Sequence, residues 1–307
     1  MAETLISALL PIVVTLFIGC FAAWHKDFTE QQADGINKLV MTYTLPLSLF
    51  GGIMTTPRVT IFSHLAVAGW LLLAMVGGYL AALFIAHFIL HQDIAISTLR
   101  SLAVASSAVP FVGPTILGSL FPTQSALLIS LGALIINVIQ VPISVILLSG
   151  SAHVQASIGE NLLAAVKKPV VWAPILAFII VLCGGQLSPA WAKNFTVLGS
   201  ATGGLALFAS GVILFSRKPI LSLPVWINTL SKNIFLPLIM FGLMVWAHTP
   251  THILNMSLMA ISIPTGAIGT ILASQYHKAE QEMASSLFLS TVLSVFTMGF
   301  IIIMRNI

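Results

Sequence analysis

Two apolar regions of the chain are interrupted by proline and glycine, at Val109-Pro110-Phe111-Val112-Gly113-Pro114 and at Ile263-Pro264-Thr265-Gly266-Ala267-Ile268-Gly269. Proline lacks a backbone donor and clashes with the preceding helical turn, so a helix through either stretch should break. Unpaired backbone groups are costly in lipid, so a break is tolerated only where protein or a water-filled cavity surrounds it. Two breaks in corresponding halves of one chain are typical of a transporter's binding site.

The composition of the chain excludes an ordinary soluble protein. Of its 307 residues, 58% are apolar and only 7% are charged, whereas soluble domains carry about 25% charged residues. We therefore expect an integral membrane protein with the lipid bilayer as its surroundings. The formal charge of +4 is too small to indicate a nucleic-acid partner and fits the basic excess of cytoplasmic loops. Cys20 and Cys183 lie in apolar runs, so no disulfide framework is expected.

Runs without Asp, Glu, Lys or Arg predict ten transmembrane helices, because a helix needs about 20 apolar residues to cross a bilayer. The N-terminal run lacks a basic flank, so we interpret it as a span and not as a cleaved signal peptide. The eighth span is expected to start before residue 233, with Lys232 extending to the membrane surface. The predicted spans are residues 4–24, one that lies mostly in 39–57, one within 59–92, two within 101–159, 169–192, 194–216, two within 233–277, and 283–304.

The basic residues predict the orientation of these spans. If both termini lie outside the cytoplasm, nine basic residues face the cytoplasm and three face outside, which is the bias expected of a multi-pass protein of the cell (inner or plasma) membrane. The nine are Lys26, Lys38, Arg100, Lys167, Lys168, Arg217, Lys218, Lys232 and Lys278, and the three are Arg58, Lys193 and Arg305.

The two halves of the chain resemble each other. Pro11 precedes Cys20 by the same nine positions that separate Pro174 from Cys183, and Val109-Pro110 corresponds to Ile263-Pro264. Five spans per half is an odd number, so the halves must insert with opposite topology, as an inverted repeat. The predicted organisation is a first five-helix repeat (1–148), a cytoplasmic connector (149–168) and a second five-helix repeat (169–307).

Several motifs, in order along the whole chain, resemble the auxin efflux carrier family. These are Gly35-Ile36-Asn37-Lys38-Leu39-Val40 with Leu45-Pro46-Leu47, the two interrupted stretches, and Ser274-Gln275-Tyr276 followed by Ala284-Ser285-Ser286-Leu287. The short connector is similar to that of compact bacterial members, among them malonate permeases. The plant exporters carry an asparagine just before the fourth-span break, where this chain has Ser107.

The resemblance implies a fold and an activity. The implied fold is an all-α integral membrane protein of ten helices in two inverted five-helix repeats, with broken helices 4 and 9 crossing at mid-membrane. The implied activity is elevator-type transport of small organic anions, with malonate-like carboxylates as the favoured substrates.

The charged residues limit the chemistry. All eight acids fall at span ends or in loops, and we expect no lysine or arginine within a span. A buried carboxylate relay and a catalytic acid pair are therefore unavailable, and we predict neither catalytic nor metal-binding residues. Helix N-termini bind carboxylates, so an anion is expected between the two breaks. The alternative is that the prolines only kink packed helices. The candidate residues are Ser106, Ser107, Pro110, Gly113, Pro114, Pro264, Thr265 and Gly266.

Other polar residues have two interpretations. Asn137 and Gln140 in the fifth span either coordinate substrate or a cation, or hold neighbouring helices together. For Ser290, Thr291 and Ser294 we favour helix packing, and for Asn37 a role at a helix end. His87 and His91, four residues apart, fit a membrane edge better than a metal site because no further ligand is evident.

The sequence thus favours a secondary transporter working by alternating access, and not an enzyme. The sequence contains no Walker P-loop, which is the motif that would indicate a primary pump. No cofactor is predicted. A non-transporting sensor or scaffold and a Na⁺-coupled carrier of a different anion are the alternatives. The sequence leaves the driving force open between Na⁺, H⁺ and the membrane potential alone. It also leaves open whether the protein forms a homodimer.

Overall fold

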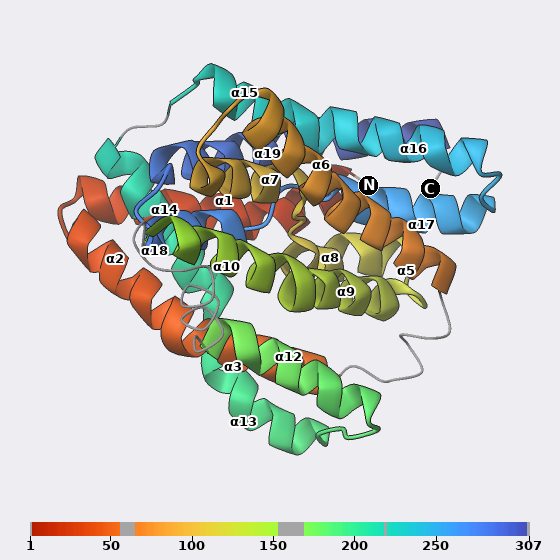
Figure 1. The fold of residues 1–307 in the computed structure, drawn as a ribbon, viewed down its shortest axis with the longest axis horizontal. Helices are drawn as coiled ribbons and strands as arrows, with labels where there is room; N and C mark the ends of the chain where they lie inside the picture. Colours follow the sequence, from red (N-terminus) through yellow and green to blue (C-terminus); the bar gives the residue numbers. More distant parts are fainter. Residues whose placement is uncertain (1, 56–64, 153–168, 218–219, 306–307) are drawn as a thin grey trace.

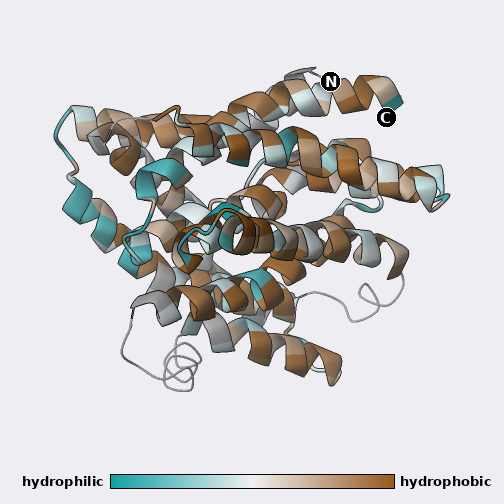
Figure 2. Ribbon diagram, turned by 45° about the horizontal axis from the view of Figure 1, so that its top comes forward, coloured by the Kyte–Doolittle hydropathy of each residue, from teal (hydrophilic) through white to brown (hydrophobic). Residues whose placement is uncertain are grey.

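The regular structure of the described residues is entirely helical. The computed structural model describes residues 2–55, 65–152, 169–217 and 220–305 (Figure 1). Among these described residues, five helical stretches are long and apolar enough to cross a membrane. Figure 2 shows hydrophobic residues along the helices, with hydrophilic residues mainly near their ends. These five are Leu65–Ile89, Leu127–Gly150, Val197–Ser216, Leu223–Trp246 and Glu280–Arg305. The all-helical prediction is confirmed at this level.

The first half of the chain begins with α1, and three of its later helical stretches have short π-helical segments inside them. The helices of this half are α1 (Ala2–Trp24), α2 (Glu30–Leu39), α3 (Leu45–Met54), α5 (Leu65–Leu72), α6 (Gly78–Phe84), α7 (Ile94–Ala105), α8 (Val109–Leu120), α9 (Ser125–Leu134) and α10 (Val141–Ala152). The π-helical segments are Val40–Thr44, Leu73–Gly77, Ile85–Ile89 and Ile135–Gln140.

The second half is also helical, with one π-helical segment, Ser231–Phe235, among its described residues. Its helices are α12 (Pro169–Leu182), α13 (Pro189–Gly199), α14 (Ala201–Arg217), α15 (Leu223–Leu230), α16 (Leu236–Trp246), α17 (Thr251–Ser262), α18 (Ile268–Gln275) and α19 (Glu280–Arg305). The predicted connector lies largely outside the described residues.

The structure extends one predicted span and corrects the boundary of another. Most of the second span was predicted in residues 39–57, and the helical stretch begins at Glu30, because Thr29 and Gln32 form a capping box that starts a helix before the apolar run. The predicted boundary at Lys193 is wrong. Lys193 lies inside α13, and the chain turns between Leu182 and Pro189 instead. The charge of Lys193 wrongly indicated the end of a span.

Helices from the two halves pack directly on each other. Helix α1 packs on α14, and α3 packs on α12 and α13. The α1–α14 crossing depends on two glycines: a Cβ atom at Gly19 would overlap the Phe208 carbonyl oxygen, and one at Gly211 would overlap the Leu16 carbonyl oxygen. The Cys20 Sγ atom donates to the Gly211 carbonyl oxygen at 3.2 Å. The backbones of α1 and α14 therefore approach as closely as glycine allows.

Candidate functional site

The two interrupted stretches lie side by side and pair through their backbones. Helix α7 ends at Ala105 and α8 begins at Val109, while α17 ends at Ser262 and α18 begins at Ile268. Ser107 and Thr265 form an antiparallel bridge. The predicted interruptions are therefore present, and the crossing of the two segments (residues 106–108 and 263–267, hereafter the crossover) is formed by both halves of the chain.

Backbone groups freed by each interruption are satisfied by the other. The Ala108 N–H donates to the Pro264 carbonyl oxygen at 2.8 Å, and the Gly266 N–H donates to the Ser106 carbonyl oxygen at 3.2 Å. The Thr265 N–H donates to Ser290 Oγ of α19 at 3.1 Å. Pro110 falls in the first turn of α8, where a missing N–H leaves no helical hydrogen bond unmade. These contacts explain how broken backbone can be tolerated inside the protein.

The crossover also holds polar atoms without partners. Ser106, Ser107 and Thr265 are buried, and neither Ser106 Oγ nor Thr265 Oγ1 has a hydrogen-bond partner among the described residues. Gln140 donates through Nε2 to the carbonyl oxygens of Met75 at 2.8 Å and of Ala105, the last residue of α7, at 3.3 Å. Its Oε1 atom is likewise unpartnered. Buried polar atoms of this kind normally have a partner, which makes the crossover a candidate binding site.

A lysine adjoins the crossover, which the sequence analysis did not foresee. Lys232 is 1% exposed, and its Nζ atom donates to Ser107 Oγ at 2.5 Å and to the Ile261 carbonyl oxygen at 3.1 Å. The predictions that Lys232 extends to the membrane surface and that no lysine lies within a span are wrong. The helical stretch starts at Leu223, so Lys232 lies roughly 14 Å along it at 1.5 Å per residue.

The start signal of that stretch was present in the sequence. Ser222 occupies the N-cap position and Pro224 lies in the first turn, which is a combination typical of a helix N-terminus. The span was expected to start before residue 233, but Lys232 was placed at its membrane edge. With the N-cap as the boundary, Lys232 would have been predicted to lie inside the span, where an ionisable residue is by default a functional candidate.

Helix α19 supports the crossover from the second half. Asn233, next to Lys232, donates through Nδ2 to the Ser290 carbonyl oxygen at 2.8 Å, and Ser290 Oγ donates to Asn233 Oδ1 at 2.6 Å. Thr291 and Ser294 donate to carbonyl oxygens of their own helix. The helix-packing interpretation of Ser290, Thr291 and Ser294 is therefore supported. Ser290 is the one of the three whose hydrogen bonds described here reach other elements.

The crossover hydrogen bonds described above do not involve the remaining predicted residues, Gly113, Asn137 and Pro114. Gly113 packs in α8 against α9, where an added Cβ atom would come within 2.9 Å of Ile129 Cγ1. Asn137 is half-buried in the same π-helical segment as Gln140. Pro114 is part of α8, one turn beyond Pro110.

A second polar network joins α7, α15 and α19. Arg100 forms a bidentate salt bridge with Glu282, in which Nε donates to Oε1 at 2.7 Å and Nη2 donates to Oε2 at 2.8 Å. The Arg100 side chain is 19% exposed and the Glu282 side chain 12%. Asn228 Nδ2 donates to Glu282 Oε1 at 3.1 Å and to Ser286 Oγ at 3.3 Å. The positive charge of Arg100 is thus already neutralised by the protein.

Replacing Glu282 with glutamine should destabilise the protein by about 2 kcal/mol, because it leaves a largely buried guanidinium without its counter-charge. The measurement is the thermal unfolding midpoint in detergent. The matched control is the double variant R100M/E282M, which removes both charges and should unfold at a higher temperature than E282Q. If the destabilisation of the double variant equals the sum of the destabilisations of R100M and E282M, a direct interaction is contradicted.

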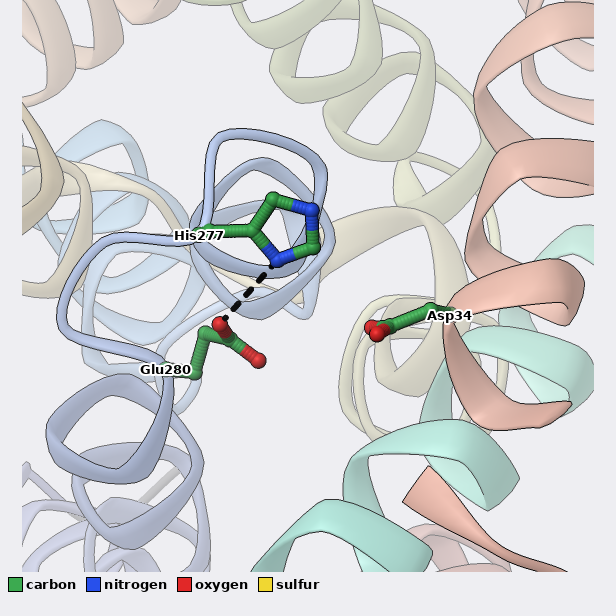
Figure 3. A group of neighbouring side chains, drawn as sticks. All are labelled: Asp34, His277 and Glu280. Atoms are coloured by element: carbon green, nitrogen blue, oxygen red, sulfur yellow. Dashed lines mark ion pairs between the residues drawn. The ribbon is translucent and has the colours of Figure 1, made fainter. Parts of the chain in front are cut away.

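Three possible metal ligands gather elsewhere, at the contact between α2 and the turn from α18 to α19. Figure 3 shows His277 paired with Glu280, at 3.5 Å between Nδ1 and Oε1, with Asp34 facing them from α2. Ser274 Oγ donates to Asp34 Oδ1 at 3.0 Å and accepts from Asn37 Nδ2 at 2.7 Å. Asn37 is therefore buried inside α2 and contacts α18, in place of the predicted role at a helix end.

Two described cavities lie away from the crossover. The larger, about 730 Å³, lies between α6 and the stretch from α15 to α16, and its wall is almost wholly apolar apart from a few groups such as Arg100, Asn228 and Ser231. The smaller, about 220 Å³, adjoins Asp34 and Ser274. No residue of 106–108 or 263–267 lines either cavity. The crossover is thus enclosed by protein in this conformation.

Comparison with known proteins agrees with a multi-pass membrane transporter. A family model described as "Membrane transport protein" matches residues 4–302. The chain is 31% identical over 297 residues to the "Uncharacterized transporter YfdV" of Escherichia coli (strain K12), and equally to the proteins of that name in Escherichia coli O157:H7 and Shigella flexneri, with 95% of each chain covered. The chain belongs to this membrane transport family, the auxin efflux carrier family. It is a membrane transporter and not an enzyme.

Proposed function

We propose that the protein is a secondary transporter that binds small organic anions, malonate-like carboxylates in particular, at the crossover. The observation that supports this most directly is the set of groups gathered there: unpartnered hydroxyls of Ser106 and Thr265, and the Nζ atom of Lys232. Hydroxyl and amino N–H groups donate hydrogen bonds, which carboxylate oxygens accept. The near-complete burial of these groups is the reason to prefer a ligand over solvent as their partner.

The proposed architecture is ten spans in two inverted five-helix repeats. It is supported by the matching interruptions in the two halves and by the packing of α1 on α14 and of α3 on α12. Figures 1 and 2 draw the two ends of the chain on the same side of the molecule, as an even number of spans requires. The proposed location is the cell membrane, with both termini outside the cytoplasm, from the distribution of the basic residues other than the buried Lys232.

The proposed mechanism is alternating access of the elevator type. An anion cannot reach the enclosed crossover unless part of the protein moves. We assign α1–α3 with α12–α14 to one body, and α5–α10 with α15–α19, which contain the crossover, to the other. The hydrogen bonds of Asp34 and Asn37 with Ser274 connect the two bodies and would break when the second body slides.

Counterflow of radiolabelled malonate in proteoliposomes tests this function. Vesicles preloaded with unlabelled malonate should accumulate label faster than protein-free vesicles, because a carrier exchanges bound substrate across the membrane. A panel of mono- and dicarboxylates added as competitors then defines the substrate class. If no carboxylate supports counterflow or competes, the proposal fails and a non-transporting sensor or scaffold becomes the better interpretation.

A further inference from the structure

The hydrogen bonding of Lys232 differs from that of a permanently charged lysine. Its Nζ atom has two acceptors, Ser107 Oγ and the Ile261 carbonyl oxygen, and no carboxylate partner among the described residues. A neutral amine carries two N–H groups, which match these two acceptors. An ammonium group carries three, so one would point into the protein unpaired. The two contacts of Lys232 Nζ therefore match the neutral amine.

The charged groups around Lys232 do not supply a counter-charge. The segment Ser231–Phe235 packs against α7, α15, α16 and α19, and α17 supplies the Ile261 acceptor. Helices α15 and α16 contain no ionisable residue. Among the charged groups of the others, Arg100 and Glu282 pair with each other. The remaining groups are His252 of α17, and Glu280 and Arg305 at the two ends of α19, where Glu280 contacts His277 and Arg305 contacts Asn255.

An anion in the crossover would change this balance. Its carboxylate would supply the third acceptor that an ammonium group needs and would compensate the charge, which is otherwise costly to bury. We propose that Lys232 is the coupling residue of the transporter: its amine takes one proton from water when the anion binds and returns that proton when the anion leaves. For fully ionised malonate, A²⁻, the charge balance is R–NH₂ + H⁺ + A²⁻ giving R–NH₃⁺·A²⁻, so each anion moves together with one proton.

This inference rests on the proposed function and extends it to the coupling ion. Calorimetric titration of the purified protein in detergent with malonate tests it, in two buffers of different ionisation enthalpy at mildly alkaline pH. Malonate is fully ionised there, so it does not itself release or take up protons. The difference in heat between the buffers gives the protons taken up per anion, which should be close to one for the unaltered protein.

Lys232→Arg is the diagnostic variant, because guanidinium stays charged. It should still bind malonate but take up no proton. Binding to the unaltered protein without proton uptake would overturn the inference while leaving the proposed function intact, as would K232R taking up as many protons as the unaltered protein. If no carboxylate of the panel binds, the proposed function fails and the inference fails with it.

A second measurement needs no variant. If proton uptake accompanies binding, the malonate dissociation constant of the unaltered protein should rise about tenfold per pH unit at alkaline pH, because binding then consumes one proton. A dissociation constant that stays constant across that range would also overturn the inference, whether or not K232R folds.

Discussion

Replacing Gly266 with leucine is expected to abolish malonate transport. A Cβ atom at Gly266 would come within 3.2 Å of Ser106 Oγ and 3.5 Å of the Ser107 carbonyl oxygen, so the rest of a leucine side chain would have to displace the facing segment. That displacement would disturb the hydrogen bond from the Gly266 N–H to the Ser106 carbonyl oxygen. The leucine would also occupy the space in which we place the anion. Uptake by proteoliposomes containing equal amounts of each variant is the measurement.

Gly242→Leu is the matched control for this prediction. Gly242 is exposed in α16 and has nothing within 4 Å of an added Cβ atom, so the same substitution there should leave uptake close to that of the unaltered protein. Folded G266L protein with unchanged uptake would show that substrate passes somewhere other than the crossover. A G266L variant that fails to fold would be replaced in the comparison by Gly266→Ala, whose smaller side chain should reduce uptake less.

Replacing Gly211 with leucine is expected to destabilise the whole protein. The added Cβ atom would overlap the Leu16 carbonyl oxygen and approach the Cys20 backbone nitrogen at 3.1 Å, and a helix backbone cannot rotate away as a side chain can. Overpacking typically costs about 1–3 kcal/mol even against side chains. For a protein of this size, a loss of about 3 kcal/mol would lower the unfolding midpoint by roughly 6–12 °C.

The control for Gly211 lies on the same helix. Gly204 is exposed, and an added Cβ atom there would meet nothing within 4 Å. Thermal unfolding of G204L in detergent should therefore follow that of the unaltered protein, while G211L unfolds at a lower temperature. Equal midpoints for G204L and G211L would mean that the close approach of α1 and α14 does not contribute to stability.

The sequence predicted the local backbone features well because their causes are local. Proline and glycine at Val109–Pro114 and Ile263–Gly269 act on their own helical turns, so the interruptions could be located without any knowledge of packing. Ser107 and Thr265 could be proposed as neighbours for the same reason. Their direct pairing, and the contact of Ser290 with Thr265, depend on how distant helices cross and are not visible in a single sequence.

The position of Lys232 was missed because charge was used to mark where spans end. That rule holds for most basic residues of a membrane protein but fails for one placed inside for function. The same rule misplaced the turn near Lys193. Both errors arose because span boundaries were assigned from charged residues and not from the residues that start helices. Ser222 and Pro224 in the first case, and Pro189 in the second, gave the better boundaries.

The mutual pairing of the two interruptions makes the two halves of the chain depend on each other. The N–H groups of Ala108 and Gly266 find their acceptors in the opposite half of the molecule. Either half inserted alone would leave one of these N–H groups without its acceptor in hydrocarbon, where an unpaired backbone group is costly. Neither half is therefore expected to be stable in a membrane without the other.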